Sequence, residues 1–315
     1  MNVLVTGGAG FIGSHLVERL LALGHRVVVL DDFNDFYDPA LKRANVAQAR
    51  THPSFRLVEG DLLDLRLLER LFDEEPFDAV AHLAAYAGVR PSLLNPLLYE
   101  RVNVAGTLGL LERCRRAAIR PRIVFASSSS VYGGRLDAPF READDVSRPI
   151  SPYAATKAAA ELMCHASAHA HDLPIWCLRF FTVYGPRQRP EMAIPLFCRA
   201  LKAGRPLRLF GGGAMARDFT YVDDIVEGIV AALVRAQGFE IINLGGEHAV
   251  TLAELVQRLE RVLGVTATVE MAPAEVGDVP LTCADITKAA RLLDWHPTID
   301  LDTGLARFAS WLNGR

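Results

Sequence analysis

A tyrosine and a lysine lie four residues apart near the middle of the chain, at Tyr153 and Lys157. Ser151 suits a helix cap and Pro152 a first helical turn, so this spacing places both side chains on one face of a helix. A phenol has a pKa of about 10 in water, which makes it a poor base at neutral pH. A nearby positive charge stabilises the phenolate and lowers that pKa. The pair therefore predicts proton transfer to and from a hydroxyl group.

Four consecutive serines, Ser127–Ser130, precede this segment and directly follow the apolar run 123–126. The run predicts a buried strand, and a serine hydroxyl at its end can hydrogen-bond a substrate hydroxyl or the phenol. A tyrosine four residues before a lysine is common on helices and is often only a surface pair. Its combination with the serines and with a glycine turn at the start of the chain favours a catalytic set.

The glycine turn is the stretch TGGAGFIG at residues 6–13. It follows the apolar run 3–5 and precedes apolar residues at helical spacing, which predicts the strand, turn and helix of a dinucleotide-binding unit. Gly7 allows a sharp turn, Gly10 lets the backbone approach a pyrophosphate, and Gly13 lets the helix pack closely on the strand. The spacing Gly-x-x-Gly-x-x-Gly departs from the usual Gly-x-Gly-x-x-Gly. The helix N-terminus offers unpaired N–H groups and a positive dipole end to phosphates.

The second predicted strand, 26–30, ends in two acidic residues, Asp31 and Asp32. They follow the glycine turn by about twenty residues, where a carboxylate accepts hydrogen bonds from an adenosine ribose. A carboxylate at that place also repels a 2′-phosphate. The sequence therefore predicts that the cofactor is NAD and not NADP.

Two further strand ends are candidates for contact with this cofactor. Asp61 follows the third predicted strand, where taken alone it suits either a contact with an adenine amine or an ordinary loop acid. Leu83, Ala84 and Ala85 follow the fourth, where small side chains let the backbone run beside a ligand. His82, just before them, is interpreted as a histidine near the core with no role in the chemistry.

Strands and helices alternate along the first part of the chain, which predicts an α/β fold with a doubly wound parallel sheet of the Rossmann type. The rhythm changes after residue 180, where prolines and a run of three glycines accumulate. We therefore expect an NAD-binding domain over 1–180 and a smaller α/β substrate-binding domain over 181–315, with part of 216–245 returning to the main sheet. The expected strands are 3–5, 26–30, 55–59, 79–83, 123–126 and 175–180, and the longest expected helices are 96–117 and 152–170.

Composition argues against several other classes of protein. A net charge of -3 gives no reason to expect binding to nucleic acid or to an anionic membrane, and no apolar stretch reaches membrane-spanning length. The chain enters a predicted strand at residue 2, which leaves no room for a signal peptide. Five scattered cysteines are typical of buried thiols in a reducing cytosol, so we expect a cytoplasmic protein. His165 and His169 lack a third ligand nearby, and no metal site is expected.

Together the motifs resemble the extended short-chain dehydrogenase/reductase family, in the branch that acts on nucleotide sugars. The resemblance covers essentially the whole chain and depends on the patterns TGGxGFIG, HLAA, SSVYG, SPYxxxK, YGP and RDFxYVxD. It implies that Ser128, Tyr153 and Lys157 are the catalytic set. It also implies a homodimer formed through the two long helices, 96–117 and 152–170.

The strand ends and the resemblance together predict the residues of two binding sites. The predicted NAD contacts are Gly7, Gly10, Phe11, Ile12, Gly13, Asp31, Asp32, Asp61, Leu62, Leu83, Ala84, Ala85, Asn103, Tyr153, Lys157, Phe180 and Val183. The predicted nucleotide-sugar contacts are Arg90, Ser128, Ser129, Thr182, Arg189, Ala193, Arg217 and Asp278. Of these, Arg217 and Asp278 fall where the family holds the nucleotide diphosphate and its ribose.

The segments around Arg90 and Arg189, and the segment 277–285, resemble those of UDP-glucuronate 4-epimerases. A sugar carboxylate needs a cationic partner, and arginine supplies planar bidentate donors. The family's pattern makes Arg189 that partner and makes Arg187 structural or close to a phosphate. Gly212 departs from the aspartate that many relatives carry, which leaves the conformation of its loop open.

The predicted activity is the interconversion of UDP-glucuronate and UDP-galacturonate through a 4-keto intermediate with tightly bound NAD. A UDP-glucuronate decarboxylase shares the first half-reaction, and a UDP-galactose or UDP-glucose 4-epimerase does not need Arg189. A 4,6-dehydratase is disfavoured because the serines at 128–130 offer no acid pair for elimination. An NAD-sensing module without catalysis is the non-enzyme alternative, which the intact Ser128, Tyr153 and Lys157 argue against.

Overall fold

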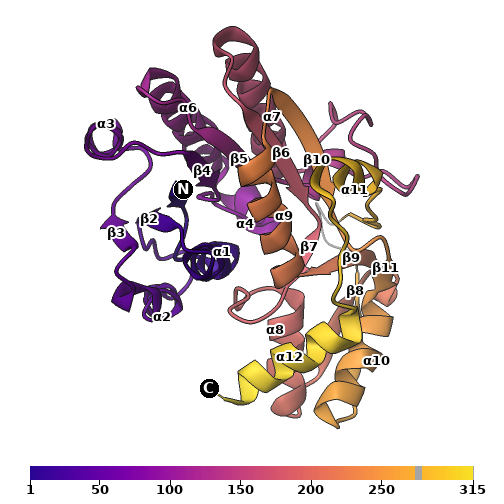
Figure 1. Cartoon of the computed structure of the whole chain (residues 1–315). Coiled ribbons are helices and arrows are strands. Elements are labelled where there is room, and N and C mark those ends of the chain that lie inside the picture. Colours follow the sequence, from indigo (N-terminus) through magenta and orange to yellow (C-terminus); the bar gives the residue numbers. More distant parts are fainter. Residues whose placement is uncertain (274–278, 315) are drawn as a thin grey trace.

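The computed structural model describes residues 1–273 and 279–314 of the chain. Its centre is a seven-stranded sheet in the order β10-β6-β5-β4-β1-β2-β3, with every neighbouring pair parallel (Figure 1). The strands are β1 (Asn2–Thr6), β2 (Arg26–Asp31), β3 (Phe55–Glu59), β4 (Ala79–His82), β5 (Arg122–Ser128), β6 (Ile175–Phe180) and β10 (Phe239–Leu244). The strand order reverses at β1, where ligands bind in such sheets. The predicted doubly wound parallel sheet is confirmed.

Helices cover both faces of the sheet, so its strands are buried apolar runs such as Val27–Leu30 (Figure 1). On one face α1 and α9 pack against each other, and on the other face α3 contacts α6 and α6 contacts α7. These helices are α1 (Phe11–Ala22), α3 (Leu65–Glu74), α6 (Thr107–Arg116), α7 (Pro152–His171) and α9 (Val222–Arg235). Shorter helices are α2 (Pro39–Asn45), α4 (Val89–Leu94) and the 3-10 turns Ala49–Thr51, Ser129–Tyr132 and Gly211–Gly213.

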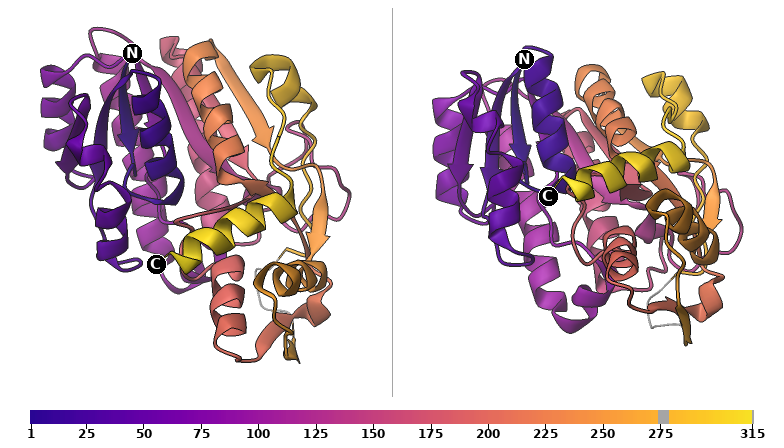
Figure 2. Two further views of the ribbon diagram at one scale, coloured as in Figure 1. Left: turned by 60° about the horizontal axis from the view of Figure 1, so that its bottom comes forward. Right: turned by 90° about the horizontal axis from the view of Figure 1, so that it is seen from below.

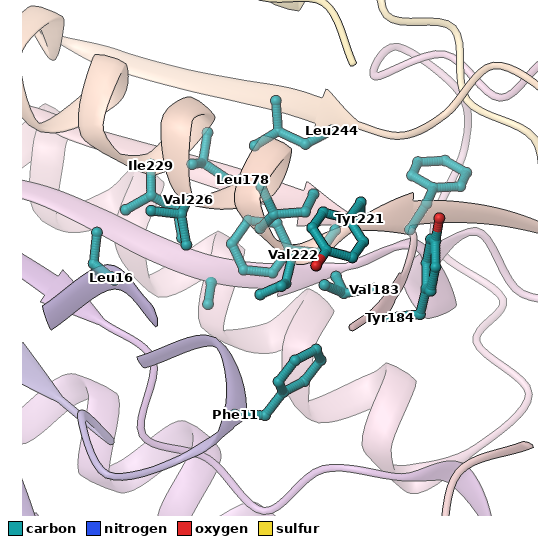
Figure 3. Close-up of a cluster of buried hydrophobic side chains, with 14 of the residues drawn as sticks. Phe11, Leu16, Leu178, Val183, Tyr184, Tyr221, Val222, Val226, Ile229 and Leu244 are labelled. Atoms are coloured by element: carbon teal, nitrogen blue, oxygen red, sulfur yellow. The ribbon is translucent and has the colours of Figure 1, made fainter. Parts of the chain in front are cut away.

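One buried apolar cluster joins the α1 and α9 face of the sheet to elements that follow β6 in the chain (Figure 3). Val222, Val226 and Ile229 of α9 follow each other at helical spacing and are buried. They lie against Leu178 of β6 and Leu244 of β10, both fully buried (Figure 3). This packing holds the carboxyl ends of β6 and β10 in place, where the chain leaves the sheet for the site.

The expected helix over 96–117 is helical throughout but changes type. α5 (Pro96–Glu100) leads into a π-helical segment, Arg101–Gly106, which leads into α6. Asn103 lies in the π-helical segment, and its side-chain amide pairs with both the backbone N–H and the carbonyl of Tyr86 at 2.9 Å. Apolar spacing cannot reveal such a segment, because it is accompanied by bonds to a loop outside the helix.

The chain after β6 forms a smaller α/β layer beyond the carboxyl ends of the main strands (Figure 2). It contains a three-stranded sheet in the order β11-β9-β7 and a two-stranded sheet of β12 and β8. Within 216–245, β9 belongs to this layer, whereas α9 and β10 cover and extend the main sheet. The elements are β7 (Thr182–Tyr184), α8 (Ala193–Lys202), β8 (Leu207–Phe210), β9 (Ala216–Tyr221), β11 (Ala249–Thr251), α10 (Leu252–Leu263), β12 (Val269–Ala272), α11 (Thr287–Leu293) and α12 (Leu301–Asn313).

None of the helices in the described part of the chain is both long and apolar enough to cross a membrane. Nor do the described residues contain a cluster of three histidine, cysteine or acidic side chains placed to hold a metal ion. His165 and His169 stack on each other with ring centroids 6.5 Å apart. The five cysteines are free thiols, and all except Cys283 are buried.

Candidate active site

A cavity of about 380 Å³ lies at the carboxyl edge of the sheet and reaches from the end of β2 to the start of α7. Residues before the end of β6 and residues of the chain that follows it both contribute to its wall. Most of the predicted site residues line it, namely Gly7, Gly10, Phe11, Ile12, Gly13, Asp31, Asp32, Asp61, Leu62, Leu83, Ala84, Ala85, Ser128, Ser129, Tyr153, Lys157, Phe180, Thr182, Val183 and Arg189. Residues separated by more than 180 positions thus meet around one space large enough for a ligand.

Four predicted site residues do not line this cavity. Asn103 is buried behind its wall and supports Tyr86, which does line it. The Arg90 guanidinium lies 4.8 Å from the centre of the Phe210 ring, and Arg217 donates to the carbonyl of Ala216. Ala193, the fourth, begins α8. Asp278 lies outside the described residues.

The glycine turn brings the backbone as close to its neighbours as the motif requires. Gly7 has φ 71°, and a Cβ there would lie 2.7 Å from the backbone nitrogen of Ala84. A Cβ on Gly13 would collide with the carbonyl oxygen of Gly7, so the helix approaches the turn as predicted. α1 begins after Gly10 without a side-chain cap, which leaves its first N–H groups to a ligand at the cavity. This geometry fits a pyrophosphate.

The acidic residues are held rigidly at the ends of their strands. Asp31 accepts hydrogen bonds from the backbone N–H groups of Ala9 and Phe33, each at 3.0 Å, and burial raises the pKa of its carboxyl. Its position is thereby fixed relative to the glycine turn. Asp61 accepts from the N–H of Leu63 at 2.9 Å. Both carboxylates line the end of the cavity that the sequence assigns to adenosine.

The catalytic set is assembled by α7 and the end of β5. The Ser151 hydroxyl accepts from the Ala154 N–H at 3.1 Å and caps α7 as predicted, so Tyr153 and Lys157 follow within its first turns. Lys157 is buried and donates to the carbonyl of Ala126 at 2.8 Å. Ser128, the last residue of β5, acts on the Tyr153 phenol by lowering its pKa. The three side chains, Ser128, Tyr153 and Lys157, all line the cavity wall.

Burial affects the acid–base properties of the pair. Burial raises the pKa of Tyr153, and the Ser128 hydroxyl and the Arg189 guanidinium act in the opposite direction. Burial also lowers the pKa of Lys157 to about 8. The net effect of the chain's own groups is therefore a phenol pKa above its usual value, because both side chains lie in an interior that disfavours charge. A phenolate here needs a further positive charge in the cavity.

Arg189 reaches the cavity from the loop that follows β7. Its guanidinium forms an ion pair with Glu191 at 3.1 Å and lies 5.6 Å from the centre of the Phe36 ring. Its side chain is 18% exposed, so it is accessible from the cavity but shielded from bulk water. Arg187, two residues earlier, instead binds Glu18 of α1 at 2.6 Å. Of these two arginines, Arg189 lines the cavity, whereas Arg187 bonds α1 and does not line it.

Comparison with known proteins agrees with this geometry. Residues 3–245 match the family described as "NAD dependent epimerase/dehydratase family". The chain belongs to this family.

Individual relatives cover nearly the whole chain. UDP-glucuronate 4-epimerase 3 of Arabidopsis thaliana is 46% identical over 330 residues, covering 99% of this chain and 76% of that protein. UDP-glucuronate 4-epimerase of Thermodesulfobacterium geofontis is 42% identical over 309 residues, covering 98% and 95%. The crystal structure of UDP-glucuronic acid 4-epimerase from Bacillus cereus, in complex with UDP-glucuronic acid and NAD, superposes with a TM-score of 0.93. It shares 37% identity and covers 100% of this chain and 99% of that one.

A buried group that the sequence motifs do not reveal lies beneath the catalytic set. Glu161 of α7 accepts hydrogen bonds from Ser127 of β5 and from Arg179 of β6. The sequence feature that points to Glu161 is its spacing. It lies one helical turn after Lys157 and on the same face of the helix. Nothing in the sequence alone indicates that Arg179, in the middle of an apolar strand, lies opposite it.

His82 is a buried histidine with both ring nitrogens in hydrogen bonds. Nδ1 lies 2.7 Å from the Thr6 hydroxyl and Nε2 lies 2.9 Å from the Thr107 hydroxyl. Burial lowers its pKa to about 3, so the ring is neutral at physiological pH. It joins β1, β4 and α6 beneath the cavity, in agreement with its interpretation as a residue of the core.

Proposed function

We propose that this protein is a UDP-glucuronate 4-epimerase that interconverts UDP-glucuronate and UDP-galacturonate with tightly bound NAD. The observation that carries the proposal is the position of Arg189, a guanidinium in the wall of the same cavity as Tyr153 and Ser128. A cationic fork beside a proton-transfer set suits a sugar that carries a carboxylate. The similarity to UDP-glucuronate 4-epimerases over almost the whole chain supports the same substrate class.

The chain's residues fit NAD along the cavity. The α1 N-terminus and Gly10 suit the pyrophosphate, Asp31 suits the adenosine ribose, and Asp61 suits the adenine amine. Phe180 lies at the opposite end, beside the catalytic set. NAD, when bound, accepts a hydride from C4′ of the sugar and returns it, and its positive ring supplies the charge that a phenolate needs.

The chain's own groups handle the proton. Tyr153, as the phenolate, removes the proton of the sugar 4′-hydroxyl, and Ser128 holds that hydroxyl and the phenol together. Lys157 places a positive charge behind the phenol and is itself anchored on the Ala126 carbonyl. After the 4-keto sugar turns about its diphosphate linkage, its other face is presented for return of the hydride to C4′, and Tyr153 returns the proton to the C4′ oxygen. One tyrosine therefore serves as base and then as acid.

Arg189 has a second task during the lifetime of the 4-keto sugar. That sugar is a β-keto acid, which loses carbon dioxide easily when the breaking bond aligns with the carbonyl π system. A guanidinium that binds both carboxylate oxygens keeps the carboxylate from rotating into that alignment. Thr182, also in the cavity wall, adds a hydroxyl on the same side of the site. Arg90, Arg217, Ala193 and Asp278 stay predicted contacts of the rest of the nucleotide sugar.

We also propose that the protein is cytoplasmic and that its domains divide near residue 180. We propose further that it forms a homodimer. The observation that supports the dimer is a set of exposed apolar side chains on α4, α5, α6 and α7, namely Leu94, Leu97, Leu108 and Leu162. Leu94 is 89% exposed and Leu162 70%, so these helices present apolar surface that a second copy would cover. Light scattering on the purified chain tests the dimer, and Leu162→Glu should shift it toward the monomer.

Proton NMR of UDP-glucuronate incubated with the protein and NAD tests the proposed function. The expected product has the signals of the galacto 4-epimer, with the C6 carboxylate retained. Appearance of a UDP-pentose would instead show a decarboxylase, and turnover of UDP-glucose at the same rate would show a neutral-sugar epimerase. No turnover of any of these sugars, with NAD bound, would favour the sensing module.

A further inference from the structure

A buried carboxylate lies beneath the catalytic set and takes no part in the mechanism above. Tyr153, Lys157 and Glu161 follow each other at four-residue intervals along α7, so they occupy one face of the helix. Tyr153 and Lys157 line the cavity, whereas the Glu161 side chain is 4% exposed and faces the sheet. A charge this deeply buried requires partners to offset the cost of leaving water.

The partners of Glu161 come from two adjacent strands. Arg179 of β6 donates to it through both Nε, at 2.9 Å, and Nη2, at 2.7 Å, and the Arg179 side chain is only 2% exposed. Ser127 of β5 donates its hydroxyl to Glu161 Oε1 at 2.5 Å. Ser127 and Arg179 are direct neighbours in the β5–β6 register, so one carboxylate joins α7 to both strands.

This bonding fixes the end of β5, where the catalytic serine lies. Ser127 lines the cavity, but its hydroxyl is committed to Glu161. Its neighbour Ser128 is the next residue of β5 and also lines the cavity. Anchoring Ser127 therefore determines where Ser128 meets the Tyr153 phenol.

The same carboxylate contributes to the electrostatic surroundings of Lys157. The Ala126 carbonyl accepts from the ammonium, and the Phe125 ring centre lies 4.9 Å from it. The titratable groups near Lys157 are Glu161 and Cys164 of α7, Cys177 of β6 and His82 of β4. Burial lowers the pKa of Lys157, and Cys164, Glu161 and Cys177 act in the opposite direction. Among these three groups Glu161 is the one held in an ion pair, at 2.7 Å from Arg179, so it carries the fixed negative charge that favours the ammonium.

We propose that Glu161 is a positioning residue for the catalytic set, which aligns Ser128 through Ser127 and places a negative charge behind the Lys157 ammonium. The effect on turnover depends on the proposed function, but the charge effect does not. Loss of the Glu161 charge disfavours protonated Lys157, so the Lys157 pKa falls. Side chains four residues apart on one helix face have Cβ atoms about 5–6 Å apart. An opposite charge within about 4–6 Å shifts a pKa by about one unit or more.

The composition of the chain allows a direct test, because it contains only four lysines, Lys42, Lys157, Lys202 and Lys288. Protein labelled with ¹³C-lysine, loaded with NAD but without sugar, gives one side-chain signal for each. Lys157→Met assigns the signal of interest. Glu161→Gln should lower the pH midpoint of that signal by about one unit. An unchanged midpoint in folded Glu161→Gln overturns the charge effect.

Ser127→Ala is the matched control, because it removes the hydroxyl and keeps both charges of the ion pair. We expect the Lys157 midpoint to stay unchanged and kcat on UDP-glucuronate to fall several-fold. A kcat equal to that of the unmodified enzyme overturns the alignment of Ser128 through Ser127. A midpoint that moves as far as in Glu161→Gln shows that loosened packing, and not charge, controls the ammonium.

A second variant covers loss of folding. Glu161→Gln leaves Arg179 buried without its partner, whereas Glu161→Gln with Arg179→Met removes both charges, a replacement that proteins often tolerate. The lowered Lys157 midpoint should persist in the double variant, and its absence there also overturns the proposal. In active protein the alkaline limb of the rate profile should move to lower pH, because the reaction needs charged Lys157. If the unmodified enzyme turns over no uronic acid, the proposed function fails while the NMR titration still decides this inference.

Discussion

The two sides of the cavity differ in how their residues reach it. On the cofactor side, most predicted residues stand at or just after the ends of main-sheet strands, and all except Asn103 line the cavity. On the sugar side most come from short elements outside the main sheet or from the loop that carries Arg189, and Arg90, Ala193 and Arg217 lie outside the cavity wall. A main-sheet strand end fixes a side chain within a few residues of a motif, whereas a loop or a short element leaves its direction to distant contacts. The cofactor side is therefore the more predictable one.

Rigidity follows the same division. Asp31 is locked by two backbone N–H groups, and Gly7 sits against the backbone of Ala84. Arg189 is held by the acidic side chain of Glu191 and the ring of Phe36, contacts that a ligand carboxylate can compete with. We expect substitutions on the cofactor side to affect folding and NAD binding together. Substitutions on the sugar side should change substrate choice with little loss of stability.

The largest expected effect is the loss of turnover on changing Tyr153, which belongs to both the cofactor side and the sugar side of the cavity. Tyr153→Phe keeps the ring and removes the phenol, so turnover should fall by about 10²–10⁴-fold on every substrate. Because the ring still packs on Tyr99, at 6.2 Å between centroids, the melting temperature and NAD affinity should stay close to those of the unmodified protein. Steady-state kinetics and NAD titration measure both. Turnover near that of the unmodified protein would remove Tyr153 from the mechanism.

Arg189→Ala tests the sugar side. Loss of a buried charge partner typically costs about 2–5 kcal/mol, so activity on UDP-glucuronate should fall by that equivalent, with NAD binding retained. UDP-glucose, which has no carboxylate, should be a poor substrate for the unmodified protein and should be much less affected by the change. A trace of decarboxylated product would agree with a freed carboxylate.

Arg187→Ala is the control for Arg189, because Arg187 lies in the same loop but binds Glu18 of α1. It should lower stability without changing the ratio of activities on the acidic and neutral sugars. If both substrates lost activity equally in Arg189→Ala, that arginine would hold the shared diphosphate or the loop. The uronic acid assignment would then fall back to a general nucleotide-sugar epimerase.

Gly7→Ala tests the close approach on the cofactor side. Alanine at positive φ costs about 1–2 kcal/mol, and here its Cβ would also press on the Ala84 backbone. Gly24→Ala is the matched control, since Gly24 has φ 77° but no atom within 4 Å of the added Cβ. Urea unfolding and NAD titration should show a small loss of stability in Gly24→Ala. Gly7→Ala should lose more stability and also NAD affinity, and equal behaviour of the two would contradict the argument.

The smallest effect is expected at Asp31. Asp31→Ala removes the predicted acceptor for the adenosine ribose, so NAD should bind more weakly and its advantage over NADP should narrow. The measurement is the affinity for each cofactor in both proteins. Asp38→Ala is the control, because Asp38 lies in the same stretch of chain but outside the cavity wall, where its side chain caps α2 through the Ala40 N–H. Equal affinity of the unmodified protein for both cofactors would contradict the assignment.

The sequence by itself determined the parallel sheet, the glycine turn and the start of α7. These features depend on short-range causes: apolar runs that must be buried, a positive φ at Gly7, and the Ser151 cap of a helix that carries Tyr153 and Lys157. Each cause lies within a few residues of its effect. A pattern in the chain is sufficient to predict them.

Only the tertiary structure decided which charges meet. Glu161 and Arg179 form a pair because β6 lies beside β5 under α7. Asn103 lies in a π-helical segment, from which its side chain bonds the Tyr86 backbone. Burial likewise raises the pKa of Tyr153, against the effect of the Arg189 guanidinium. Burial and pairing are properties of packed elements far apart in the chain, and an electrostatic energy depends on the resulting distances and on exclusion of water. Local spacing carries no information about either.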